Sequence, residues 1–242
     1  APHVIQRGGG YSMFYGDWQN ICLAQSLDGK TFTRALDTNG RPQLFTEDFG
    51  VFANTRDAMV LPIAETLYCY YTAYSLDATS GKKQGAAYCR TSKDLRTWSE
   101  SKRVAFGGQS GTGPGSAECP HVVARHGWFY LFRTQQYGRS ARTCVYRSKD
   151  PLDFGILDDR YFLCVLPVAA IEIVRHEDQD YMAALLPSLK GIQIARLDWV
   201  PKEKWIGSGQ IRGKRLFDFE DPNVRAGWKR IEGDVSPVFT TS

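Results

Sequence analysis

The sequence repeats one phrase four times, and this repeat constrains the fold more than any other feature. Each copy has a short apolar stretch, a tight turn and an aromatic stretch, and the copies begin near residues 3, 59, 121 and 173. Intervals of 52 to 62 residues are typical of a repeat architecture. In the clearest copy, Glu118 precedes an apolar strand at 121–124, a turn at His126-Gly127 and an aromatic strand at 128–132.

Each of the first three copies continues with a third strand that ends in a turn centred on a serine, and an aromatic residue then begins a fourth strand. The serines are Ser26, Ser92 and Ser148, and the aromatic residues are Phe32, Trp98 and Phe154. Four antiparallel strands per unit, repeated around an axis, describe a β-propeller. At roughly 40–50 residues per blade, this chain would hold about five blades. The sequence therefore predicts an all-β, five-bladed β-propeller of four-stranded antiparallel blades.

The repeat also sets the predicted domain organisation. Blades one to four are expected over residues 1–206, with boundaries near 45, 107 and 166. Residues 207–242 fit the pattern least well. Their candidate strands would form a fifth blade or closing strands, or would begin a β-sandwich that the chain end cuts off.

Charge and hydropathy exclude several kinds of partner. The formal net charge is +4, and Lys and Arg are scattered among Asp and Glu, which argues against nucleic acid. No stretch approaches the ~18 consecutive apolar residues of a membrane span. The sequence therefore predicts a soluble chain with no membrane partner. It leaves open the oligomeric state and the compartment, which could be secreted, periplasmic or cytoplasmic, with or without a removed signal peptide.

The cysteines and the glycine-rich tract are expected to be structural. The six cysteines never form a Cys-x-x-Cys pair, which argues against a zinc site. We expect mostly buried free thiols, and a disulfide between Cys69 and Cys89, on adjacent predicted strands, stays open. The tract at 107–117 lacks the Lys-Ser/Thr ending of a phosphate-binding loop, so it is expected to lead into blade three. No cofactor is predicted, although a channel cation such as calcium stays open.

The candidate chemistry lies where the predicted inner strands begin. The first strand of each propeller blade lines the central channel, so residues that open successive first strands converge. This register brings together Asp57, its neighbour Arg56, and Glu118, while Glu172 lies two positions further along its strand. Charged groups that converge in a narrow channel raise one another's proton affinity. One protonated carboxyl beside an ionised one is the arrangement that general acid catalysis requires.

These residues also carry a resemblance to a known family. Arg56-Asp57 and Glu118-Cys119-Pro120 resemble motifs of the five-bladed glycoside hydrolases that include invertases, levanases and fructosyltransferases, and of the related arabinanase and β-xylosidase family. The resemblance covers roughly residues 1–200. It implies that Arg56 and Asp57 stabilise the transition state, that Glu118 is the acid/base, and that the substrate is a furanoside or another small glycoside.

One of the carboxylates that the resemblance leads us to expect is missing from this sequence. The third carboxylate of the resembled family, the nucleophile or general base, is an Asp that opens blade one before a Pro, and Ala1 stands in that position here. Three explanations stay open: a replaced Asp, a chain trimmed at its start, or a natural relative that has lost hydrolysis. Asp17, beyond the second strand, is expected on the opposite rim and is therefore a poor substitute.

Four further residues are predicted to contact the carbohydrate, each with a structural alternative. His3 and His121 follow a Pro at equivalent repeat positions, where a shared packing role is the alternative to binding a sugar or a metal ion. Glu172 could contact sugar or pair with Arg175. Trp18 could stack on a sugar face or anchor its loop.

The sequence therefore supports three classes of function. The first is a glycosidase acting on a furanoside or other small glycoside, with its activity in doubt because of Ala1. The second is a non-catalytic carbohydrate-binding propeller that keeps Asp57 and Glu118. The third is a protein-interaction propeller, against which stands the presence of carboxylates at successive channel positions.

Overall fold

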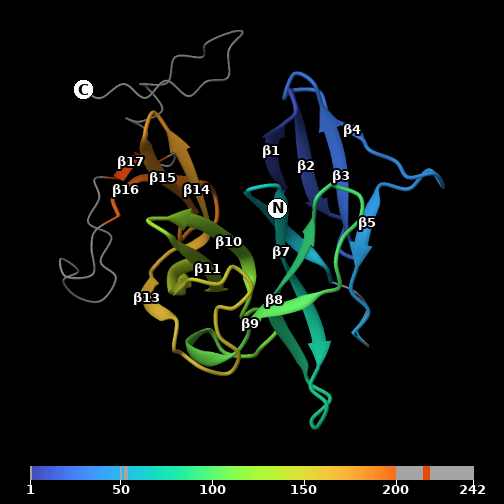
Figure 1. The fold of residues 1–242 in the computed structure, drawn as a ribbon. Coiled ribbons are helices and arrows are strands. Elements are labelled where there is room, and N and C mark those ends of the chain that lie inside the picture. Colours follow the sequence, from blue (N-terminus) through green and yellow to red (C-terminus); the bar gives the residue numbers. More distant parts are fainter. Residues whose placement is uncertain (1, 50, 52–53, 200–214, 219–242) are drawn as a thin grey trace.

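The computed structural model describes residues 2–49, 51 and 54–199, and the backbone of 215–218. Four antiparallel sheets surround a common centre (Figure 1). Within each sheet the strands follow one another in chain order. The innermost strands of successive sheets contact one another around the centre. This is a β-propeller arrangement with four described blades, which confirms the prediction of an all-β propeller.

The strand bounds show how the repeat becomes four blades. Blade one contains β1 (His3–Arg7), β2 (Gly10–Gly16), β3 (Asn20–Ser26) and β4 (Thr33–Arg34), with β5 (Gln43–Thr46) also paired to β3. Blade two contains β6 (Arg56–Ile63), β7 (Thr66–Leu76), β8 (Lys83–Ser92) and β9 (Lys102–Ala105). Blade three contains β10 (Glu118–Arg125), β11 (Trp128–Gln136), β12 (Arg142–Ser148) and β13 (Phe162–Leu166). Blade four contains β14 (Ala169–His176), β15 (Gln179–Leu185), β16 (Ile192–Leu197) and β17 (Arg215–Asp218).

The outer strand of blade four comes from the predicted closing segment. β17 pairs with β16 and completes the fourth sheet, so residues 215–218 belong to that blade. The remainder of 207–242, with the other candidate strands of a fifth blade or β-sandwich, lies outside the described residues. Two short 3-10 helices, η1 (Gly108–Ser110) and η2 (Gly138–Ser140), complete the assigned elements. Within the described part of the chain, no helix has the length and apolar character that crossing a membrane requires.

The turns centred on serine form as the sequence predicts. Ser26 Oγ accepts hydrogen bonds from the backbone N–H groups of Asp28 and Gly29, and Asp28 Oδ1 accepts from Lys30 and Thr31. Blade two repeats this pattern from its own serine and aspartate. These side chains accept hydrogen bonds from the backbone N–H groups of the turn. In both blades the turn therefore connects the third strand to the fourth.

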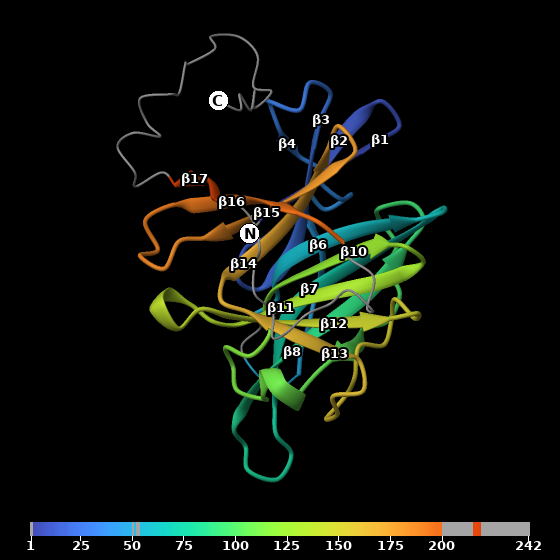
Figure 2. The same cartoon turned by 90° about the vertical axis from the view of Figure 1, so that its left-hand side faces the viewer.

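The core consists of apolar layers between adjacent blades, and Figure 2 shows the sheets of these blades from a second direction. Phe14 of blade one meets Trp98 of blade two edge to face, with ring centroids 6.1 Å apart. Tyr70 of blade two meets Phe154 of blade three at 6.4 Å. All six cysteines are free, and Cys69 and Cys89 are both buried, which answers the open disulfide question. Burial of apolar surface between blades supplies the main stabilisation of such a fold.

The inner strands of blades two, three and four share one irregularity. Each contains a β-bulge near its first residue, where the register jumps over two residues. The residues inside these bulges, Asp57, Cys119 and Ala170, have φ of 57°, 46° and 51°. Such φ values cost residues other than glycine about 1–3 kcal/mol, and bulges redirect side chains near functional sites. The same costly bend in three blades therefore marks this end of the channel as a candidate site.

Candidate functional site

The bulges place the predicted charged residues at one end of the channel. Arg56 and Glu118 are the first residues of β6 and β10, and Asp57 and Cys119 follow them inside the bulges. We call the cluster of Arg56, Asp57, Glu118 and Cys119 the axial site. The structure thus brings together the three charged residues that the sequence selected.

Arg56 links the two carboxylates of the axial site. Its Nη2 forms an ion pair with Glu118 Oε1 from the neighbouring blade, and its Nε lies 3.8 Å from Asp57 Oδ2. The guanidinium also donates to Tyr74 Oη at 2.6 Å and to Asn54 Oδ1. Its side chain is only 10% exposed. Because these partners hold the guanidinium from several sides, its charge is fixed between the two carboxylates.

Asp57 is fixed by the neighbouring blade as well. Its Oδ2 accepts a hydrogen bond of 3.0 Å from the backbone N–H of Cys119. The thiol of Cys119 lies 3.4 Å from the hydroxyl of Tyr137. Burial raises the pKa of Cys119 to about 12, so the thiol stays protonated and is not activated as a nucleophile.

The electrostatic surroundings of Glu118 favour its protonated form. Burial raises the pKa of this carboxyl above its ordinary value, the Arg56 charge lowers it, and the Asp57 charge raises it again. The net direction is upward, although the ion pair opposes it. A carboxyl whose pKa is raised by burial is suited to donate a proton near neutral pH.

Two aromatic residues stand over Arg56 at equivalent positions of blades one and two. Arg56 Cζ lies 5.8 Å from the ring centroid of Trp18 and 4.8 Å from that of Tyr74. Trp18 is 69% exposed, so most of its ring is free to meet a ligand. The sequence selected Trp18 and missed Tyr74, together with Tyr137. An alignment of the second strands on Phe14 and Tyr70 would have paired Trp18 with Tyr74.

The two predicted histidines join adjacent blades. His3 Nδ1 accepts the backbone N–H of Val60 at 3.2 Å, and His121 Nε2 accepts that of Ile173 at 3.0 Å. Their rings meet edge to face with centroids 6.3 Å apart. Burial lowers the pKa of His3 to about 4 and that of His121 to about 3, so both imidazoles are neutral acceptors. The packing role considered from the sequence is therefore present, and sugar contact stays a prediction.

Glu172 faces the same end of the channel. With His3, Asp57 and His121 it lines a hollow of about 20 Å³ on the axis, which is room for about one water molecule. Burial raises the pKa of Glu172. Arg175, which the sequence offers as a partner for Glu172, instead forms ion pairs with Asp178 and Asp180.

The third carboxylate position is not occupied by Asp17. This residue lies on the same rim as the start of β1, because the antiparallel β2 returns there, so the expectation of the opposite rim was wrong. Its carboxylate accepts hydrogen bonds from Gln19 and Asn20 within its own turn, at Oδ1 and at Oδ2, so both oxygens have local partners. Ala1 itself lies outside the described residues.

A buried arginine holds the segment that leads to Glu118. Arg133 is 1% exposed and donates to the carbonyl oxygens of Ser116, Gly107 and Gly111 at 2.7, 3.3 and 2.9 Å. These acceptors span the glycine-rich tract, so Arg133 fixes its path. Sequence reasoning missed this residue because an arginine within a strand resembles a surface residue.

The sequence leaves open whether a cation such as calcium binds in the channel. Among the described residues, no group of three or more His, Cys, Asp or Glu side chains is arranged to hold a metal ion.

Comparisons with solved structures identify the fold. A thermostable family-43 glycoside hydrolase superposes with a TM-score of 0.60 at 16% identity, covering 83% of this chain and 72% of that one. A GH43_1 enzyme from Xanthomonas citri gives 0.56 at 18% identity, covering 86% and 71%. A GH32 β-fructofuranosidase from Bombyx mori gives 0.58 at 12% identity, covering 87% and 48%, so this chain spans about half of that enzyme. No protein-family model matches the chain, and no curated protein matches it.

These likenesses show which class of fold the chain adopts. It has the β-propeller fold of family-43 and family-32 glycoside hydrolases, the group that the resemblance indicated. At identities below 20% the likeness concerns the fold, and the function has to be argued from the axial site.

Proposed function

We propose that this chain is a glycosidase-like propeller that binds a furanoside or another small glycoside at the axial site. The observation that supports the proposal best is the cluster in which Arg56 joins Glu118 and Asp57 across two blades. The repeat of the blades would bring together side chains of any kind at these positions, so the informative observation is which residues occupy them. Two carboxylates that both contact one guanidinium, beside an exposed tryptophan, are suited to recognise sugar hydroxyls and a charged transition state.

In this proposal each residue has a separate role. Glu118 protonates the leaving oxygen of the glycosidic bond as an oxocarbenium-like centre develops. Asp57, held by Arg56 and by the Cys119 N–H, accepts hydrogen bonds from sugar hydroxyls that strengthen in the transition state. Trp18 covers one face of the sugar. His3, His121 and Glu172 complete the channel side of the site.

A second candidate is a non-catalytic carbohydrate-binding propeller. Ala1 supports it, since this residue stands in the position of the third carboxylate. Equivalent bulge positions in blades three and four hold Cys119 and Ala170, neither of which supplies a carboxylate. Without a nucleophile or base, binding would survive while turnover falls.

We also propose that the complete propeller has five blades. In Figure 1 the four described sheets leave one side of the circle open between blade four and blade one. Residues 219–242 follow β17 and are the part of this chain from which strands of that blade would come.

One experiment tests the two candidates against each other. Hydrolysis of nitrophenyl furanosides, nitrophenyl pyranosides, sucrose and arabinan is measured on this chain and on an Ala1→Asp version with a native upstream extension. A glycosidase is expected to show activity in the extended version and to lose about 10²–10⁴-fold with Glu118→Gln, the range for a general acid. Glu65→Gln, on an exposed turn, is the control.

The other results separate the alternatives. If both versions stay inactive while sugar binds and Asp57→Ala abolishes that binding, the chain is a carbohydrate-binding propeller. If no carbohydrate binds and nothing is hydrolysed, both candidates are wrong.

A further inference from the structure

The register of the blades shows one position at which blade one differs from the other three. The second strands of blades two, three and four carry a tyrosine opposite the same residue of their first strands: Tyr68, Tyr130 and Tyr181. Blade one carries Ser12 there, opposite Ile5. A large side chain is thus replaced by a small one at one of four equivalent positions.

The tyrosines show which contacts a residue at this position makes in the other blades. Tyr68 packs against the apolar layer between blades two and three. Tyr130 of blade three packs on Trp199 of blade four, with ring centroids 4.7 Å apart. A tyrosine here fills the outer part of the gap between one blade and the next, and Ser12 cannot.

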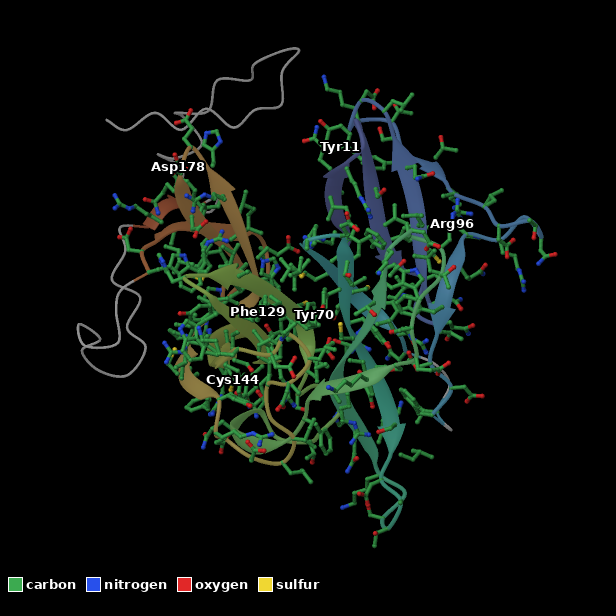
Figure 3. All side chains as sticks on the ribbon, viewed as in Figure 1. Tyr11, Tyr70, Arg96, Phe129, Cys144 and Asp178 are labelled. Atoms are coloured by element: carbon green, nitrogen blue, oxygen red, sulfur yellow. The ribbon has the colours of Figure 1, made fainter. Side chains whose placement is uncertain are left out.

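A hollow lies where blade one lacks this tyrosine. It has a volume of about 580 Å³, within the range of about 300–1,000 Å³ that ligand pockets occupy. It lies between β1–β3 and the β8–β9 connection of blade two, which carries Leu95. Arg96 of the same connection reaches blade one, where it donates to Ala35 O at 3.2 Å (Figure 3). The hollow opens at the β1–β2 turn, beside which Tyr11 lies, whereas the axial site lies at the other end of the inner strands.

The floor of the hollow contains a polar group. Ser12 is 6% exposed as a residue and lines the hollow. A ligand in the hollow that carries hydroxyl groups could therefore hydrogen-bond the hydroxyl of Ser12.

The remaining wall residues indicate which ligand would fit. Gln25 and Thr33 extend the row of Ser12 across the sheet, and both side chains are exposed into the hollow. Arg7 adds one guanidinium, while the carboxylate of Asp28 is occupied by its own turn. Neutral donors and acceptors therefore predominate, with one cation and no free carboxylate among them.

We propose that this hollow is a second carbohydrate-binding site, which takes a neutral sugar unit on the face opposite the axial site. Hydroxyl and amide groups at Ser12, Gln25 and Thr33 would hydrogen-bond sugar hydroxyls, and Leu95 would cover an apolar face of the ring. The site does not depend on catalysis at the axial site. It would hold a second part of a long glycan or a separate chain.

The test is a residue-resolved titration of this protein with arabinohexaose, xylohexaose, fructo-oligosaccharides and galactose, followed by ¹H–¹⁵N spectra. Binding in the hollow is expected to give saturable shifts of the Gly10, Gln25 and Thr33 amides with at least one of these probes. Shifts of the Glu118 and Cys119 amides report the axial site separately. If no carbohydrate bound at the axial site, the shifts of the amides in the hollow would therefore still report binding there.

Variants decide whether such shifts come from the hollow. Ser12→Tyr restores the residue of the other blades and is expected to weaken binding at least tenfold while the thermal unfolding temperature is kept or raised. Ala78→Tyr, on an exposed loop, is the matched control that adds a tyrosine elsewhere. If Ser12→Tyr does not fold, Gln25→Ala takes its place and should weaken binding as well. Absence of saturable shifts with every probe, or shifts that persist in the substituted hollow, would overturn the proposal.

Discussion

Arg56 and Glu118 form an ion pair although sixty-two residues separate them. Each is the first residue of an inner strand, and each precedes a bulge with positive φ. Their contact is therefore produced by the repeat of the blade, which brings equivalent positions of neighbouring blades together. The chemistry of the site depends on which residues occupy those positions.

Replacement of Asp57 by Asn should lower the pKa of Glu118. The negative charge of Asp57 raises that pKa, and removal of a charge this close shifts a pKa by about one unit or more. Asn keeps an oxygen that can accept the Cys119 N–H. A ¹³C titration of the Glu118 carboxyl measures the effect without requiring activity, with Asp178→Asn on an exposed turn as the control.

The same change predicts a direction for any activity. A general acid must be protonated, so the rate falls as pH rises through its pKa. With Asp57→Asn, the alkaline side of the profile of kcat/KM should therefore move to lower pH. A Glu118 pKa that stays the same or rises in Asp57→Asn would contradict the electrostatic account of the site.

Trp18→Ala should weaken carbohydrate binding while leaving the fold intact. The ring is 69% exposed beside Arg56, so its removal costs little packing but deletes the flat surface over the charged cluster. We expect about tenfold lower affinity, or ~1.4 kcal/mol, by calorimetry. Trp128→Ala at the start of β11, the end of that strand away from the axial site, provides the comparison. Equal losses in both variants would show that Trp18 has no special role.

The sequence predicts the parts of the site that follow from the repeat. Aligning the copies places Arg56, Asp57 and Glu118 at successive inner-strand starts, and the structure brings them together. The bulges could not be predicted because the three bulge positions hold Asp57, Cys119 and Ala170, which share no residue type that favours positive φ.

Other features depend on contacts that alternation along a strand does not reveal. Arg133 is buried because the glycine-rich tract folds over it and supplies carbonyl acceptors. The prediction that Asp17 lies on the opposite rim is wrong because the antiparallel second strand returns to the end at which the first strand begins. The Ser12 hollow becomes visible only when register is known in all four blades.

Gly85→Ala should disturb the segment that leads to Glu118. A Cβ at Gly85 would lie 2.5 Å from Pro114 O and 3.0 Å from Gly113 O, and both atoms belong to the backbone of the glycine-rich tract. We expect a loss of about 1–3 kcal/mol of stability and faster amide exchange over residues 107–117. In Gly113→Ala the new Cβ meets nothing within 4 Å, so this variant should behave as the wild type. Similar effects of the two substitutions would mean that the close approach is unimportant.

His121 should make the stability of the protein depend on pH. Its pKa is lowered from 6.5 to about 3 by burial and by His3, so below pH 6.5 the unfolded chain binds a proton that the folded chain excludes. Stability is therefore fully present above pH 6.5 and is lost as the pH falls toward about 3. His3, with a pKa of about 4, adds to the loss in the same direction.

His121→Gln isolates this contribution. Glutamine can still accept the Ile173 N–H but does not titrate, so its free energy of unfolding should fall less between pH 7 and pH 4 than that of the wild type. Urea unfolding at a series of pH values measures the difference, and His126→Asn on an exposed turn should keep the wild-type slope. Parallel curves for wild type and His121→Gln would show that the imidazole between blades three and four is not responsible for acid sensitivity.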